Sequence, residues 1–330
     1  MRTLVVSDLH LGSRLGHDVL RGTEPRERLL DALDGVDRLV LLGDVVELME
    51  GRPRQALAIA EPILRELGAR LGPDRRVMLV PGNHDAPLVR AWVRAQGRAL
   101  GPSSPVPADA SPTLAQLVGW LEPARVQIRY PGAWLSERVW ATHGHYLDRH
   151  LLPESAYGIL SRRPSERARP IDYELARRPS MSRVVGRLPR PLAALLDDVA
   201  ELARAATMPR LIRRHLLRVR FAPLTAALLG VQVRRASIPA LLRVVERLGI
   251  DAEWVIFGHV HRLGPLEEDA PETWRGTTGR PRVANTGSWV HEPLLIHRAK
   301  ASRPYWPGGA VLLEDGGEPR AISLLGEPFG

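Results

Sequence analysis

The feature that most constrains the fold of this sequence is a series of short apolar runs, each followed at once by a cluster of polar residues. In open α/β sheets, ligands bind at the carboxyl ends of the strands. We therefore expect the clusters to meet at one site. They contain six of the eleven histidines and are Asp8-Leu9-His10, Gly43-Asp44, Gly82-Asn83-His84-Asp85, His143-Gly144-His145 and Gly258-His259-Val260-His261.

The apolar runs are predicted to be β-strands that alternate with helices. Between the second and third runs, for example, Ala56, Ile59, Ile63 and Leu67 recur at helical spacing. Short apolar strands that alternate with helices are typical of βαβ units, so the sequence predicts an α/β fold. The predicted strands are residues 2–7, 38–42, 76–80, 126–130, 139–142, 254–257, 282–285 and 310–313.

Residues 151–250 differ from the rest of the chain in charge and in pattern. They hold 19 arginines against eight acidic residues, a net charge of +11, whereas the remainder carries −2. Prolines at helix-length intervals punctuate them, and Leu241, Val244 and Leu248 follow helical spacing. We predict a basic α-helical subdomain at 151–250, inserted into a catalytic domain of residues 1–150 and 251–330.

Composition excludes several classes of protein and of site. The chain has no cysteine, which rules out a disulfide scaffold, an iron–sulfur cluster and a cysteine nucleophile. The longest central stretch without charge is residues 221–233, shorter than the roughly 20 residues that span a bilayer. The first residues are typical of a strand and not of a signal peptide. We therefore expect a cytoplasmic protein.

The spacing within the clusters favours metal binding. Asp8 and His10 are two residues apart, as are His259 and His261, so the side chains of each pair can point to the same side. Carboxylate, imidazole and amide ligands suit Mn, Fe or Zn better than Ca. Because the clusters offer more ligands than one ion needs, we expect two divalent transition-metal ions, with Mn as the first choice.

Taken in order, the five clusters resemble the motifs of the calcineurin-like metallophosphoesterase family, over roughly residues 1–150 and 251–290. The resemblance implies a four-layer α/β/β/α sandwich with a dinuclear metal centre. It implies that Asp44 bridges the two ions, that His84 lies beside the substrate phosphate and that Asp85 orients His84. It also implies the remaining ligands, which are Asp8, His10 and His261 on one ion and Asn83, His143 and His259 on the other.

Some positions depart from the family pattern or leave a choice open. Glu47 stands where the second motif often ends in Asp. His143 is the expected ligand, with His145 as its competitor. The sequence around His10 and His143 also resembles the branch that cleaves UDP-diacylglucosamine in lipid A synthesis. That branch tends to have Arg at the position of His84, so the match to its substrate is weak.

The resemblance implies hydrolysis of a phosphoester. Two divalent ions can lower the pKa of a water that they share, and the resulting bridging hydroxide attacks phosphorus in line with the leaving oxygen. A protonated His84 would stabilise charge on the phosphoryl oxygens or protonate the leaving group.

Three hypotheses remain open for the basic insertion. In the first, a basic amphipathic helix around Ile212, Leu216 and Val219 rests on an anionic membrane, and the substrate is lipid-linked. In the second, its arginines bind nucleic acid, which makes the protein a nuclease or a nucleotide phosphodiesterase. In the third, the chain is a non-catalytic scaffold that keeps the fold.

Overall fold

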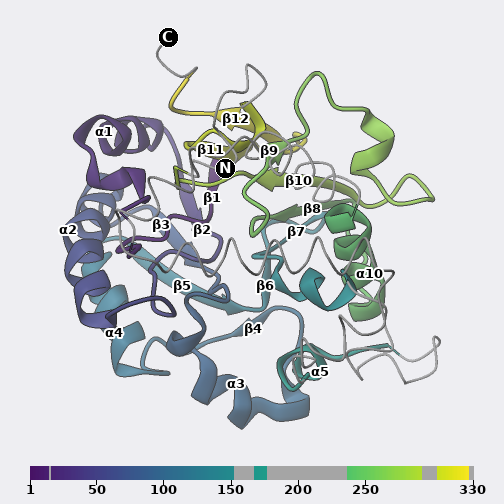
Figure 1. The fold of residues 1–330 in the computed structure, drawn as a ribbon, viewed down its shortest axis with the longest axis horizontal. Helices are drawn as coiled ribbons and strands as arrows, with labels where there is room; N and C mark the ends of the chain where they lie inside the picture. Colours follow the sequence, from purple (N-terminus) through teal and green to yellow (C-terminus); the bar gives the residue numbers. More distant parts are fainter. Residues whose placement is uncertain (15, 152–166, 177–235, 292–302, 327–330) are drawn as a thin grey trace, which may run out of the picture.

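Two mixed β-sheets form the centre of the molecule (Figure 1). The computed structural model describes residues 1–14, 16–151, 167–176, 236–291 and 303–326. The first sheet has the order β12-β11-β1-β2-β3-β5-β4, in which β1, β2, β3 and β5 run parallel. Its strands are β1 (Thr3–Val6), β2 (Arg38–Leu41), β3 (Arg76–Leu79), β4 (Ser104–Pro105), β5 (Arg125–Tyr130), β11 (Gly309–Leu313) and β12 (Arg320–Ser323).

The second sheet has the order β6-β7-β8-β10-β9, with β7, β8 and β10 parallel. Strands from the middle and from the end of the chain therefore lie side by side in it. Its strands are β6 (Gly132–Trp134), β7 (Val139–Thr142), β8 (Trp254–Phe257), β9 (Leu263–Gly264) and β10 (Arg282–Thr286).

Helices cover the outer face of each sheet. In Figure 1, α1, α2 and α4 lie on one flank and α10 lies on the opposite flank. α2 begins at Pro53, where the missing amide hydrogen costs nothing, and ends before Gly72. The α-helices in the described ranges are α1 (Thr23–Ala32), α2 (Pro53–Leu71), α3 (Arg90–Gln96), α4 (Pro112–Trp120), α5 (Pro170–Glu174) and α10 (Ile238–Leu248). Short 3-10 helices are η1 (Val19–Arg21), η2 (Ala86–Leu88), η3 (Gly97–Ala99), η4 (His145–His150), η8 (Pro271–Trp274) and η9 (Arg303–Tyr305).

Among the described residues, the alternation of side chains along each strand builds three apolar cores. In β1, Leu4 and Val6 pack into the core beneath the first group of helices, while Val5 faces the second sheet. In β8, Ile256 belongs to the core between the sheets, and Phe257 packs with α10. Every residue of these two strands is buried, which explains why they read as continuous apolar runs in the sequence.

The strand predictions are confirmed, since each predicted run overlaps a strand of the structure. The helical spacing in residues 241–248 is confirmed as α10, whose apolar side packs against the second sheet. Most of the predicted insertion, including residues 212–220 and their arginines, lies outside the described residues. Its limits at 151 and 250 and its helical character therefore stay predictions.

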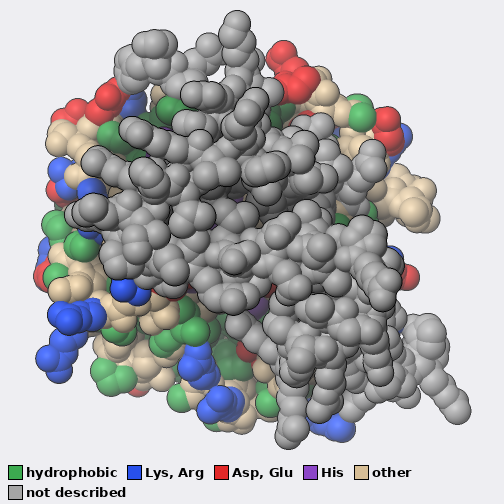
Figure 2. Space-filling view, viewed as in Figure 1, with side chains coloured by type: hydrophobic (Ala, Val, Ile, Leu, Met, Phe, Trp, Pro, Cys, Tyr) green, Lys and Arg blue, Asp and Glu red, His purple; other side chains and the backbone are tan. Residues whose placement is uncertain are grey.

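The described surface carries both signs of charge. In the space-filling view, basic side chains gather on the lower left and acidic side chains along the upper edge (Figure 2). None of the helices in the described ranges is both long and apolar enough to cross a bilayer.

Candidate metal centre

The five polar clusters meet where parallel strands of both sheets end. Backbone hydrogen bonds join one cluster to the next: Asp8 N donates to Gly43 O (3.0 Å), and His10 N donates to Asp44 O (2.8 Å). In the second sheet, Gly258 N donates to His143 O (2.9 Å). The convergence expected at the carboxyl ends of the strands is therefore present.

The backbone of this region is held in an unusual conformation. Five non-glycine residues in the described part of the chain have positive φ angles between 44° and 70°. Left-handed backbone costs of order 1–3 kcal/mol at each such residue and tends to cluster at functional sites. All five are residues that the sequence analysis placed on a metal: Asp8, His10, Asp44, His259 and His261.

Two glycines allow the loops to approach this closely. A Cβ added at Gly82 would meet the Asp44 carboxylate and would lie 2.8 Å from the Asp44 backbone nitrogen. A Cβ at Gly258 would lie 2.6 Å from Asp8 Oδ2. A larger residue at either position would push a candidate ligand out of place.

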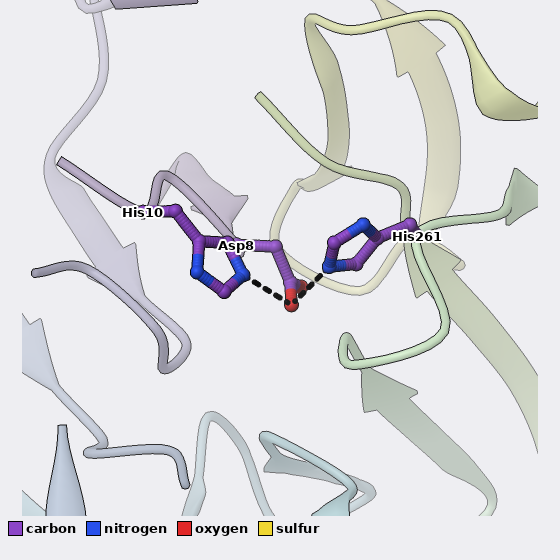
Figure 3. Close-up of side chains that lie close together, drawn as sticks. All are labelled: Asp8, His10 and His261. Atoms are coloured by element: carbon purple, nitrogen blue, oxygen red, sulfur yellow. Dashed lines mark ion pairs between the residues drawn. The ribbon is translucent and has the colours of Figure 1, made fainter. Parts of the chain in front are cut away.

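One group of candidate ligands consists of Asp8, His10 and His261. Figure 3 shows the two imidazoles on either side of the Asp8 carboxylate. His261 Nε2 lies 3.2 Å and His10 Nε2 lies 3.9 Å from Asp8 Oδ1. The other carboxylate oxygen, Oδ2, accepts from the backbone N–H of His259 (2.9 Å) and from the Ser7 hydroxyl. Oδ1 is therefore the oxygen left to face the histidines.

A second group consists of Asp44, His143 and His259. His143 is fully buried, and its Nδ1 lies 3.0 Å from the carbonyl oxygen of Leu42. Its Nε2 lies 3.1 Å from Asp44 Oδ2 and 3.1 Å from Asn83 Oδ1. With Nδ1–H donated to the Leu42 carbonyl, the lone pair of Nε2 would face two oxygen atoms. A cation between them would convert this repulsion into attraction.

Asp44 lies between the two groups. Its Oδ2 is 3.7 Å from His10 Nε2 and 3.1 Å from His143 Nε2. A third combination, His10 with Asp44 and His84, lies at the same place. The carboxylate of Asp44 is thus close enough to contribute to both ligand groups.

The donor set fits divalent transition metals. Two atoms that bind one such ion at about 2.0–2.2 Å can lie no more than about 4.4 Å apart. The separations of 3.2 Å from Asp8 Oδ1 to His261 and 3.7 Å from Asp44 to His10 satisfy this limit. Asp8 Oδ1 and His10 Nε2 are also buried without a hydrogen-bond partner in the described part of the chain. Buried polar atoms normally have such partners, so these two are suited to an ion.

The electrostatics of the centre favour bound cations. Burial would lower the pKa of His143, but the carboxylates of Asp44 and Asp8 outweigh it and raise that pKa to about 10. Burial would raise the pKa of Asp8, yet His261 and His143 lower it to about 2. Burial also opposes ionisation of Asp44, but His143 holds its pKa well below the usual range. The carboxylates are therefore ionised, and metal ions would take the place of the protons on the histidines.

His84 lies against a carboxylate other than the expected one. The family resemblance implies that Asp85 orients His84. In the structure, His84 Nδ1 lies 2.7 Å from Glu47 Oε2, which is also 3.1 Å from His10 Nδ1. The signal for Glu47 in the sequence was its place three residues after Asp44, at the end of the second motif, but we did not expect it to contact His84.

Asp85 instead supports the backbone of the site. Its buried carboxylate accepts from the backbone N–H groups of Val45 (3.0 Å), Val46 (2.9 Å) and Gly82 (3.3 Å). Burial and the neighbouring Asp44 charge raise the pKa of Asp85 to about 6. These bonds tie the loop after β3 to the loop after β2.

His143 and His145 have different surroundings. His143 belongs to the second ligand group, whereas His145 Nε2 lies 3.4 Å from the hydroxyl of Tyr130 and 4.0 Å from Glu174 Oε1. Burial and the neighbouring His143 and His259 lower the pKa of His145 to about 3. His145 is therefore a neutral imidazole among tyrosines.

A separate cavity of about 310 Å³ opens at the opposite, amino ends of the parallel strands, where Thr3 and Arg38 begin β1 and β2. Charged side chains that line it pair with one another, as Arg282 does with Glu318 (2.5 Å). None of the candidate metal ligands lines this cavity.

Comparison with known proteins agrees with this geometry. The family described as calcineurin-like phosphoesterase matches residues 1–191, more than half of the chain. The chain belongs to the calcineurin-like phosphoesterase family. The match includes Asp8, Asp44, Asn83 and His143, but it ends before His259 and His261. The assignment of His259 and His261 to the candidate metal centre is therefore supported by the structure and not by the family match.

Two solved structures that resemble this family member have low TM-scores. YfcE, a phosphoesterase from E. coli, is 24% identical, with a TM-score of 0.24 over 44% of this chain and 58% of its own. The chain thus spans less than two thirds of that protein. A dimetal phosphatase from Danio rerio is 13% identical, with a TM-score of 0.38 over 98% of this chain and 99% of its own. No curated protein matches the chain.

Proposed function

We propose that this protein is a phosphoester hydrolase that works with two divalent metal ions. The observation that carries the proposal is the meeting of two ligand groups, Asp8 with His10 and His261, and Asp44 with His143 and His259. Asn83 Oδ1 lies 3.1 Å from His143 Nε2 and completes the second group. When bound, the ions would polarise the phosphoryl oxygens and lower the pKa of a water molecule.

The remaining chemistry belongs to side chains of the chain. His84 is partly buried, and its Nδ1 faces Glu47, which leaves Nε2 for a substrate oxygen. The Glu47 carboxylate favours the protonated imidazole and, with Asp44, outweighs the effect of burial and raises the pKa of His84. We infer that His84 holds a proton on Nε2 and donates it to a phosphoryl oxygen or to the leaving group.

Asp44 and Asp85 fix the position of this proton donor. Asp44 Oδ1 accepts from the backbone N–H of His84 (2.8 Å), while Oδ2 faces the histidines. The Asp44 carboxylate thus positions both the candidate histidine ligands and the backbone of His84. Asp85 has a positioning role, because it accepts hydrogen bonds from the backbone of the loop after β2.

The proposal is tested by hydrolysis assays on metal-stripped protein. The full chain is incubated with Mn²⁺, Fe²⁺ or Zn²⁺ and then given aryl phosphomonoesters and phosphodiesters. We expect hydrolysis that depends on added metal, with Mn²⁺ the most effective, and two ions per chain by elemental analysis. Absence of hydrolysis with every metal, or a protein that binds no ion, would contradict the proposal.

A further inference from the structure

Asp148 lies beside the metal centre, although neither the sequence motifs nor the three ligand groups include it. It belongs to η4, the short 3-10 helix that directly follows His143 and Gly144. Its Oδ1 lies 2.9 Å from Nε2 of His259. This pair joins two cluster regions that are 111 residues apart in the sequence.

An imidazole that binds a metal through one nitrogen carries its proton on the other nitrogen. That second N–H normally donates to a carboxylate or a carbonyl, which fixes the tautomer and the orientation of the ring. We propose that Asp148 is a positioning residue that accepts the Nε2–H of His259, so that Nδ1 faces the second metal position. This inference rests on the proposed dinuclear function.

The neighbouring histidines follow the same arrangement. His143 has Nδ1 against the Leu42 carbonyl oxygen and turns Nε2 toward Asp44 and Asn83. His10 has Nδ1 against Glu47 and turns its unpartnered Nε2 into the site. In both rings, one nitrogen is held by an acceptor and the other faces the ligand group. Asp148 supplies the missing acceptor for His259.

Side chains from beyond residue 170 hold η4 in place. The hydroxyl of Tyr146 donates to Glu174 Oε1 (2.6 Å), and its ring stacks on Tyr173 with centroids 4.6 Å apart. The hydroxyl of Tyr173 also lies 2.9 Å from His150 Nε2. Both ends of η4 are therefore fixed by α5, which keeps Asp148 in reach of His259.

The test is a calorimetric titration of metal-stripped full-length protein with Mn²⁺. Asp148→Ala removes the acceptor, whereas the amide oxygen of Asp148→Asn can still accept from Nε2–H. Loss of such an acceptor typically weakens metal binding 10–100-fold. Because the side chain of Asp148 is 53% exposed, water can replace part of its effect, and we expect a loss of about 10-fold at one of two sites. Asp148→Asn should bind within about threefold of wild type.

The outcomes separate this inference from the proposed function. Asp109→Ala, at an exposed residue in the loop before α4, serves as the control and should bind as wild type does. Wild-type affinity in Asp148→Ala would overturn the positioning role. An equal loss of Mn²⁺ affinity in Asp148→Asn and Asp148→Ala would also overturn the positioning role. The carboxylate of Asp148 would then bind the metal directly. A wild-type chain that binds no Mn²⁺ would instead overturn the dinuclear function. Thermal melting of the metal-free variants checks that each one is folded.

Discussion

One carboxylate oxygen of Glu47 faces the Nδ1 atoms of both His10 and His84, and replacing Glu47 with Gln tests that arrangement. Oε2 lies 3.1 Å from His10 Nδ1 and 2.7 Å from His84 Nδ1. Oε1 accepts from the backbone N–H groups of Met49 (3.0 Å) and Glu50 (2.8 Å). The side chain is 3% exposed, so water cannot replace these partners. An amide has only one oxygen, and its NH₂ group would face N–H donors on one edge or the other.

The expected loss follows from these contacts. A hydrogen bond to a charged group contributes about 1.5–3 kcal/mol. If Glu47→Gln removes about 2 kcal/mol of support for protonated His84 in the transition state, kcat/KM should fall about 30-fold. His10 would still have its metal bond, so the variant should hold two ions when Mn²⁺ is in saturating excess.

The assay compares turnover of an aryl phosphodiester with metal content at saturating Mn²⁺. Glu50→Gln is the matched control, because Glu50 is exposed and only its backbone contacts Glu47. It should keep wild-type kcat/KM. This role of Glu47 is refuted if Glu47→Gln, folded and holding two ions, is as active as wild type. It is also refuted if its activity loss is explained fully by loss of metal.

Three further predictions concern the same centre. Asp44→Asn should abolish hydrolysis and reduce bound metal, whereas His84→Ala should lower kcat about 10²–10⁴-fold with metal largely retained, as elemental analysis and turnover would show. In the metal-free protein the pKa of His10 is about 9 and that of His143 about 10, both raised by nearby carboxylates against the effect of burial. Both are thus protonated at pH 7.5, so filling both metal positions should release about two protons, and affinity should increase as pH rises toward 9–10. Calorimetry in buffers of different ionisation enthalpy measures this release, and no release would contradict these pKa values. Gly82→Ala should destabilise the fold by about 1–3 kcal/mol in denaturant unfolding, because its Cβ would meet Asp44 and His143; an unchanged unfolding midpoint would show that the loop can adjust.

The sequence by itself determined the strands and the order of the polar clusters. Strands such as β1 and β8 are buried on both faces, so their continuous apolar runs are readable without a structure. The position of Asp8 or His143 directly after a strand follows from the same pattern. The two-residue spacing of His259 and His261 was also enough to suggest that their side chains point to the same side.

Only the tertiary structure decided which side chains contact one another. His143 and His145 are equivalent by spacing, but β7 and η4 place one beside Asp44 and the other beside Tyr130. Contacts of Glu47 with His84 and of Asp148 with His259 join distant segments and depend on loop geometry that no local pattern encodes. The reason is physical: five of the seven candidate ligands project from left-handed backbone positions, and packing of the two sheets, not local preference, holds the backbone there.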